Sequence, residues 1–201
     1  MLTTLFEKSL FEIIDPIVPA EARNNTLEKL IRDSNIPLIE ACKCAVAIYR
    51  IGHQLNIQAD FPEKKIVISK LAFLQRLVGG CEIFFSARIG RSLLVVHGFG
   101  TIIGPRVTVG NNLTIYHGCT IGTRYDTSSI ANATIGNDVI IYAGAKIIGN
   151  IHIGDNVVIG ANAVVTKDIP AQSIVAGVPG KVIGCRGDSI SDKYKLPPDV
   201  A

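Results

Sequence analysis

The sequence predicts a mainly β fold, a parallel β-helix of six-residue repeats with an N-terminal α-helical region. Two observations support this prediction. Glycine is unevenly distributed, because of the 19 glycines only Gly52 precedes Gly79. From there to about residue 187, aliphatic residues return every six positions, a period that fits no helix. The two parts of the chain therefore follow different backbone rules.

The repeat unit is an aliphatic residue, often followed directly by glycine. Six residues can form one short strand and one corner, and three such units form one triangular coil. Stacked coils bury the aliphatic residues and hydrogen-bond along the axis, so twelve units in register predict about four coils. Two of the intervals carry two extra residues. The aliphatic positions are Ile89, Val95, Ile103, Val109, Ile115, Ile121, Ile135, Ile141, Ile147, Ile153, Ile159 and Val165.

The N-terminal part has the spacing of helices. From Pro37 to Gly52, apolar and small residues recur at intervals of three and four, which is typical of one helical face. A second periodic set from Val67 to Leu77 ends at Gly79-Gly80, a typical C-terminal stop. We therefore expect a helical region at 1–80, a β-helix at 81–185 and a C-terminal tail at 186–201.

Composition narrows the class of protein. The chain is 48% hydrophobic and 18% charged, with a net charge of +3, which argues against disorder. No apolar run approaches the roughly 18 residues of a membrane span, and no leader pattern is present, so we expect a cytoplasmic protein. Basic residues do not cluster with aromatics, so nucleic-acid binding is not expected. Five scattered cysteines indicate buried free thiols rather than disulfides.

Two histidines occupy positions suited to acid–base chemistry. His97 lies where the repeat gains two residues, so the backbone must bulge and lift this side chain off the coil. Counted through the bulge, His97 and His117 stack at one corner, about 4.8 Å apart. Glu82 falls near the same corner one coil below, where a carboxylate could fix the imidazole tautomer. His53 and His152 are expected to be a packed and a solvated histidine, respectively.

The repeat, with the segments Ala143 to Asn150 and Ala176 to Gly184, resembles the hexapeptide acyltransferases, and within them the serine acetyltransferase branch. The resemblance covers about residues 40–186. It implies a left-handed parallel β-helix of hexapeptide repeats, an exception to the usual crossover hand. It also implies homotrimers, with pairing of trimers left open, and acyl-CoA bound in the groove between neighbouring prisms.

The same resemblance assigns the catalytic residues. The segment from Cys81 to Arg91, followed by Val96-His97-Gly98, looks like the segment that carries the catalytic Asp and His of serine acetyltransferases. His97 is then the expected general base for a hydroxyl that attacks the thioester of acetyl-CoA, and Glu82 stands at the Asp position. A covalent acyl-enzyme on Cys119 is the alternative, although its place in the repeat predicts burial.

The acceptor site departs from the family pattern. Ile130-Ala131-Asn132 replaces the Asp-Arg-His that the resemblance leads one to expect for an amino-acid acceptor, and Val96 replaces an Asp. We therefore expect a hydroxyl of a sugar or polysaccharide, as in acetyltransferases that modify capsule sugars. The alternatives are a serine O-acetyltransferase of cysteine biosynthesis and a non-catalytic trimeric scaffold. The expected acceptor-binding residues are His117, Arg124 and Asn132.

The acetyl-CoA site should offer backbone groups and small side chains to pantetheine and cations to the phosphates. No metal is expected, because a His-only site needs a third histidine, and position 137, counted as one coil above His117, is Asn. The expected donor-binding residues are Thr123 near the thioester, Ala143, Gly144 and Ala161 in the groove, and Lys167 and Lys181 at the phosphates.

Overall fold

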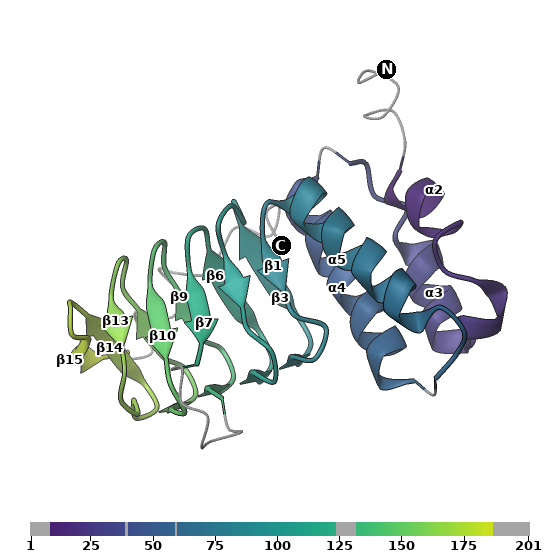
Figure 1. The fold of residues 1–201 in the computed structure, drawn as a ribbon. Helices are drawn as coiled ribbons and strands as arrows, with labels where there is room; N and C mark the ends of the chain where they lie inside the picture. The colour runs from purple at the N-terminus through teal and green to yellow at the C-terminus, as the bar shows by residue number, and fades with distance from the viewer. Residues whose placement is uncertain (1–8, 39, 59, 124–131, 187–201) are drawn as a thin grey trace.

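The computed structural model describes residues 9–186, apart from 39, 59 and 124–131. Helices form one end of the molecule, and a row of triangular coils extends from them (Figure 1). The expected tail lies outside the described residues from position 187 onward. Among the helices described here, none is long and apolar enough to cross a membrane.

The helical end follows local sequence signals. The side chain of Asn24 accepts a hydrogen bond from the Leu27 amide and so caps the helix that follows. The last helix stops where Gly80 adopts a left-handed conformation with φ 62°, as the glycine signal predicts. The elements are α2 (Leu10–Ile14), a 3-10 turn η1 (Ala20–Ala22), α3 (Asn25–Asp33), α4 (Ala41–Ile57) and α5 (Lys64–Gly79).

The rest of the described chain consists of short strands separated by corners. The strands are β1 (Glu82–Ile83), β2 (Arg88–Ile89), β3 (Leu93–Val96), β4 (Ile102–Ile103), β5 (Thr108–Val109), β6 (Leu113–Tyr116), β7 (Thr120–Gly122), β8 (Thr134–Ile135), β9 (Ile140–Ile141), β10 (Lys146–Ile148), β11 (His152–Ile153), β12 (Val158–Ile159), β13 (Val164–Val165), β14 (Ser173–Ala176) and β15 (Lys181–Cys185). As far as β13, strands three apart in sequence pair in parallel, and β12 then pairs in parallel with β14, which gives the three faces of a prism.

The three sheets have the orders β1-β4-β7-β10-β13, β2-β5-β8-β11 and β3-β6-β9-β12-β14-β15. The fold prediction of a parallel β-helix is therefore confirmed. Its first sheet has five strands, so the described residues form five coils rather than the expected four. The repeat begins earlier, at Ile83, and continues to Ile169 and Val175, all of which are buried.

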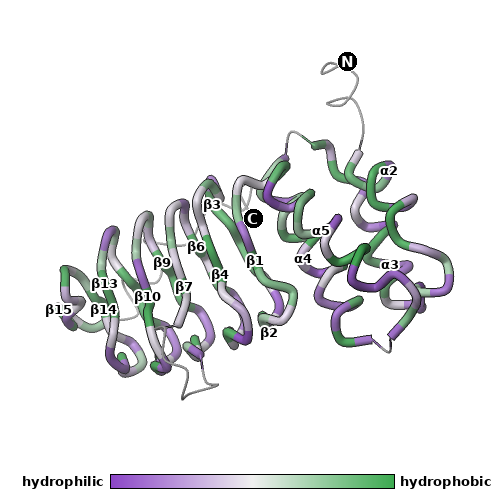
Figure 2. The backbone as a smooth tube through the Cα atoms, viewed as in Figure 1, coloured by the Kyte–Doolittle hydropathy of each residue, from purple (hydrophilic) through white to green (hydrophobic). Residues whose placement is uncertain are grey.

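Burial follows the repeat, because the aliphatic residue of each unit points into the prism while its neighbours point out. Hydrophobic stretches alternate with hydrophilic ones along every coil (Figure 2). At the far end β15 turns back and pairs antiparallel with β14. This pairing covers part of the last coil, whose strand edge would otherwise be open.

Helix α4 is fastened to the first coil by polar side chains. The Tyr49 hydroxyl donates to the Ala87 carbonyl at 2.9 Å and accepts from the Ile89 amide at 3.1 Å. His53 Nδ1 lies 2.8 Å from the Phe85 carbonyl oxygen, which confirms its expected packed role. The helical end and the first coil therefore share one continuous core.

Candidate active site

His97 projects from a bulged turn between β3 and β4. Val96 pairs with Tyr116, and the Gly118 amide donates to the Phe99 carbonyl at 2.8 Å. Three residues, 97 to 99, therefore lie opposite the single residue His117, as the longer repeat interval predicts. The backbone has φ 60° at His97 and 34° at Gly98, so the turn stores strain of about 1–3 kcal/mol at His97.

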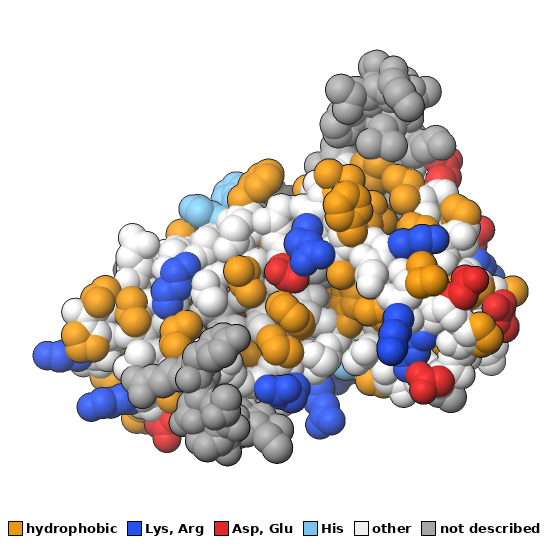
Figure 3. Space-filling model, in the orientation of Figure 1, with side chains coloured by type: hydrophobic (Ala, Val, Ile, Leu, Met, Phe, Trp, Pro, Cys, Tyr) orange, Lys and Arg blue, Asp and Glu red, His pale blue; other side chains and the backbone are white. Residues whose placement is uncertain are grey.

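His97 and His117 stack at one corner of the prism, as predicted. Their ring centroids are 6.0 Å apart and the ring planes make an angle of 61°, an edge-to-face arrangement. Both residues are exposed, and histidine side chains reach the surface at an edge of the coils in Figure 3. Exposed imidazoles can exchange protons with a bound acceptor, which is what a general base requires.

Small residues continue the corner beyond His117. The Gly144 amide donates to the His117 carbonyl, and the Asn162 amide donates to the Ala143 carbonyl, each at 2.9 Å. Ala143 therefore lies one coil above His117, and Ala161 lies one coil above Ala143. The predicted donor-groove residues thus share the corner with the histidine pair.

This order corrects the expectation that position 137 lies above His117. The chain between β7 and β8 adds residues that shift the count, and Ala143 takes that place. Asn137 belongs to another corner, where it accepts from the Asn111 amide at 2.9 Å and donates through its own amide to Asp155 at 2.6 Å. Within the described ranges, no three side chains of the metal-binding types gather in one place.

A column of glycines runs beside the histidine corner. Gly100, Gly118 and Gly144 have φ values of 69°, 67° and 75°, respectively, which favour glycine. A Cβ at Gly118 would lie 3.6 Å from the Gly144 Cα, so the column is closely stacked. Directly beside the histidines, at Gly100 and Gly118, the column therefore presents backbone, which suits an amide chain such as pantetheine. At Gly144 the Oδ1 of Asn162 fills the space that a side chain would take.

Lys146 is a neighbour of this column that the sequence analysis did not single out. Its Nζ donates a hydrogen bond to the Gly118 carbonyl, the residue directly after His117. The strand register places Lys146 above Thr120 and below Val164. The sequence alone predicts a solvated surface position for a lysine within an aliphatic repeat. Only the folded structure shows that the Lys146 side chain reaches the histidine corner.

Thr123 and Lys167, two of the predicted donor-binding residues, lie at a different edge of the prism. The Gly149 amide donates to the Gly122 carbonyl, which puts Gly149 over Thr123, and the β10–β13 register puts Lys167 above Gly149. Thr123 and Lys167 thus share the opposite edge of the first sheet. Lys181 lies opposite Ala176 at the far end of the third sheet. Arg124 lies outside the described residues.

Asn132 is buried away from the histidine pair. Its Nδ2 donates to the Pro105 carbonyl, and its Oδ1 has no partner within the described part of the chain. Its side chain is only 6% exposed, so within one chain it cannot reach an acceptor held by His97 or His117. Its predicted place in the acceptor site stays a prediction.

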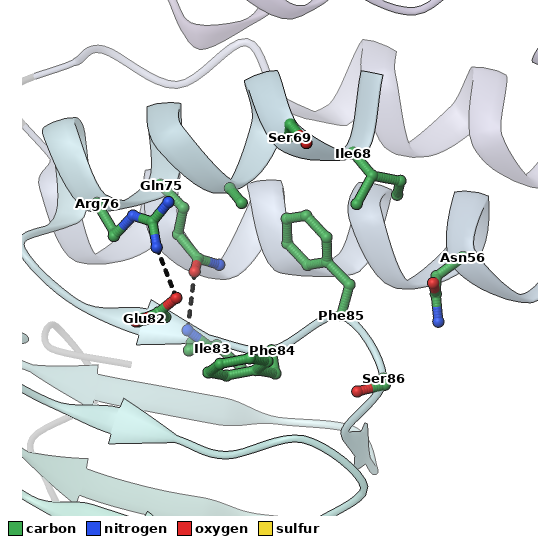
Figure 4. A pocket seen from close by; sticks show the side chains of 11 residues that line it. Asn56, Ile68, Ser69, Gln75, Arg76, Glu82, Ile83, Phe84, Phe85 and Ser86 are labelled. Carbon is green, nitrogen blue, oxygen red and sulfur yellow. Dashed lines mark hydrogen bonds and ion pairs between the residues drawn. The ribbon is translucent and has the colours of Figure 1, made fainter. Parts of the chain in front are cut away.

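Glu82 contacts a different partner from the one expected. Its carboxylate accepts a hydrogen bond from Arg76 at 2.7 Å, while Gln75 accepts from the Ile83 amide at 2.8 Å (Figure 4). Both groups line a cavity of about 320 Å³ between α5 and the first coil. Among the described residues no hydrogen bond joins Glu82 to His97, so the expected dyad stays a prediction.

Cys119 is buried, as predicted, and unsuited to covalent chemistry. Its Sγ donates to the Tyr142 carbonyl at 3.1 Å, and its side chain is fully buried. Burial raises the pKa of this thiol above its ordinary value of 9.0. A buried neutral thiol is a poor nucleophile, which disfavours the acyl-enzyme alternative.

Residues 132–167 match the family described as bacterial transferase hexapeptide (six repeats). The chain is 39% identical over 157 residues to serine acetyltransferase of Staphylococcus aureus, covering 76% of this chain and 71% of that one. It is 40% identical over 139 residues to serine acetyltransferase of Helicobacter pylori, covering 69% and 79%. The chain belongs to the serine acetyltransferase family.

Solved structures of family members share the fold. Serine acetyltransferase of Neisseria gonorrhoeae has a TM-score of 0.67 and 32% identity, covering 78% of this chain and 59% of that one. The enzyme from Brucella abortus has a TM-score of 0.68 and 33% identity, covering 73% and 58%. The chain therefore spans about three fifths of the length of these family members. It is also 39% identical over 156 residues to the serine acetyltransferase of Synechococcus elongatus. That match covers 76% of this chain and 62% of that one.

These family members correct the expected acceptor. Each is named a serine acetyltransferase, which contradicts the sugar or polysaccharide hydroxyl inferred from the sequence. That inference rested on departures from the family pattern at Val96 and at residues 130–132. Similarity over three quarters of the chain outweighs these four positions.

Proposed function

We propose that this chain transfers the acetyl group of acetyl-CoA to the hydroxyl of L-serine. Membership of the serine acetyltransferase family supports the reaction and its acceptor. The observation that carries the proposal within this chain is the exposed, stacked pair of His97 and His117 beside a strip of backbone and alanine.

In this proposal His97 is the general base. Its imidazole takes the proton of the serine hydroxyl as the oxygen attacks the thioester carbonyl of acetyl-CoA. The tetrahedral intermediate then collapses and the carbon–sulfur bond breaks. The CoA thiolate takes the proton from the imidazolium, which restores neutral His97 and leaves O-acetylserine.

The donor would lie along the small-residue strip. Ala143, Gly144 and Ala161 leave room for pantetheine, and Lys181 lies toward the end of the same corner. Thr123 and Lys167 lie at the opposite edge of the first sheet. The two groups of donor-binding residues on one chain would therefore not contact the same acetyl-CoA molecule. A homotrimer, with acetyl-CoA between neighbouring prisms, would bring the two edges together, and light scattering should then report three chains per particle.

The proposal is tested by thiol release from acetyl-CoA with the purified full chain. L-Serine is compared with nucleotide sugars and oligosaccharides as acceptors. We expect serine alone to stimulate release. Release stimulated by a glycan and not by serine, or no stimulated release at all, would overturn the proposed function.

A further inference from the structure

Lys146 carries a positive charge beside the histidine corner. Its Nζ donates to the Gly118 carbonyl, a neutral acceptor, and it forms no ion pair with any described carboxylate. An ammonium group has three N–H donors, so two remain for another ligand. Arg76, by contrast, is already neutralised by Glu82 at 2.7 Å.

The glycine column next to this ammonium contributes no side chains of its own. Gly118 directly follows His117, and its column neighbours are Gly100 and Gly144. The column next to the two histidines therefore presents backbone at Gly100 and Gly118, while the Oδ1 of Asn162 fills the space where a side chain at Gly144 would lie. Lys146 is the first residue of β10, two residues after Gly144. Its side chain extends to Gly118 on the coil below, toward the histidines.

The acceptor of the proposed reaction needs both a base and a cation. L-Serine has its hydroxyl on Cβ and its carboxylate bound to the adjacent Cα, so the two groups that recognise them must lie close together. The Arg expected for a carboxylate is Ala131 in this sequence. A carboxylate next to an ammonium forms a charge-assisted hydrogen bond, about twice as strong as a neutral one.

We propose that Lys146 binds the carboxylate of L-serine and thereby selects an amino-acid acceptor. This inference rests on the proposed function. The hydroxyl of the bound serine then faces the histidine pair, and the carboxylate takes the ammonium donors that Gly118 leaves unused. Lys146 is an acceptor-binding residue in this scheme and takes no part in proton transfer.

The test compares Lys146→Met and Lys146→Arg with the wild type in the full chain. Met keeps the length and apolar stem but removes the charge, whereas Arg restores the charge. We expect Lys146→Met to raise the KM for L-serine roughly 10- to 100-fold with little change in kcat or in the KM for acetyl-CoA. Lys146→Arg should recover much of the serine KM.

Ethanolamine, which is serine without its carboxylate, supplies the discriminating readout. Its inhibition constant against L-serine should be the same in the wild type and in Lys146→Met. Lys65→Met, on the exposed surface of α5, is the matched control and should behave as the wild type.

Two results would overturn the inference while the proposed function stands. One is a fall in kcat with an unchanged serine KM, which would make Lys146 part of the chemistry. The other is an equal loss of affinity for serine and ethanolamine, which would make its role structural. A wild type that does not turn over serine overturns the proposed function itself.

Discussion

At the scale of single residues, the exposed position of the His97 imidazole depends on a backbone turn. Positive φ values at His97 and Gly98 turn the chain outward, and the ring of Phe99 packs where a side chain at Gly80 would lie. A Cβ at Gly80 would be only 2.4 Å from that ring. Because Gly80 has no side chain, the ring of Phe99 can pack against the end of α5, and this contact holds the turn in place.

The ion pair of Glu82 leads to a prediction at this scale. Its partner Arg76 is 53% exposed and the carboxylate side chain is 31% exposed, so the pair contributes about 1 kcal/mol or less. Glu82→Gln should change the free energy of unfolding by no more than that. It should leave kcat within about threefold of the wild type, because Glu82 contacts Arg76 rather than His97.

The measurements are urea unfolding and steady-state kinetics, with Glu63→Gln, an exposed position, as the control. A fall in kcat of a hundredfold or more in Glu82→Gln would restore the dyad. It would mean that Glu82 leaves Arg76 and orients His97 when the substrates bind.

At the scale of elements, the contact between α4 and the first coil fixes the base of the prism. Tyr49 is fully buried, and its hydroxyl bridges the Ala87 carbonyl and the Ile89 amide. Gly52, one turn further along α4, lets the ring of Phe85 approach, because a Cβ there would lie 2.6 Å from the ring. Both contacts set the helix against the coil that carries His97.

Tyr49→Phe should destabilise the protein by about 1–3 kcal/mol, because it leaves a buried carbonyl and a buried amide without their partner. Urea unfolding followed by circular dichroism measures the effect. Phe73→Leu, on the exposed face of α5, should change stability little. An unchanged midpoint in Tyr49→Phe would show that the two backbone groups find other partners and that this junction is not fixed by the hydroxyl.

Much of this element arrangement could be predicted from the sequence, because a six-residue period dictates parallel coils. The count of coils was too low. Ile83 lies six residues before Ile89 and continues the period, whereas Ile169 follows Val165 by only four residues and interrupts it before Val175.

The register across the 122–134 segment was also missed. Ile121 and Ile135 lie on successive strands, so this interval holds eight residues more than the period of six. Counting by the period therefore placed Asn137, rather than Ala143, above His117.

The candidate site was predicted only in part, for a similar reason. Stacking of His97 on His117 follows from counting residues within one sheet, and it is confirmed. The contact of Arg76 with Glu82 depends on where the last turn of α5 meets β1, and the contact of Lys146 with Gly118 depends on how β10 stacks on the coil below. Neither has a signal in the linear spacing.

At the scale of the whole molecule, buried thiols make stability depend on alkaline pH. Burial raises the pKa of Cys81 from its ordinary value of 9.0 to about 12, with a smaller contribution from Cys42. Burial likewise raises the pKa of Cys44 to about 11. Above pH 9 the unfolded chain loses these protons while the folded chain keeps them.

The stability contribution of these thiols is therefore complete below about pH 9 and is lost as the pH rises toward their folded pKa values, by about 1.4 kcal/mol per pH unit for each thiol. Cys81→Ala should make the decline between pH 9 and 11 shallower by that amount. Urea unfolding at several pH values measures it, and the exposed Cys185→Ala serves as control. Equal slopes in both variants would contradict the assignment to Cys81.

The whole molecule places one exposed histidine turn at the end of the helical region and a small-residue corner leading away from it. The most direct measurement is the formation of O-acetylserine from acetyl-CoA and L-serine, quantified by mass spectrometry for the wild type and His97→Ala. We predict product with the wild type and a loss of about 10²- to 10⁴-fold in the variant, with acetyl-CoA binding retained. Equal product from both proteins would contradict His97 as the base, and no O-acetylserine from the wild type would contradict the reaction.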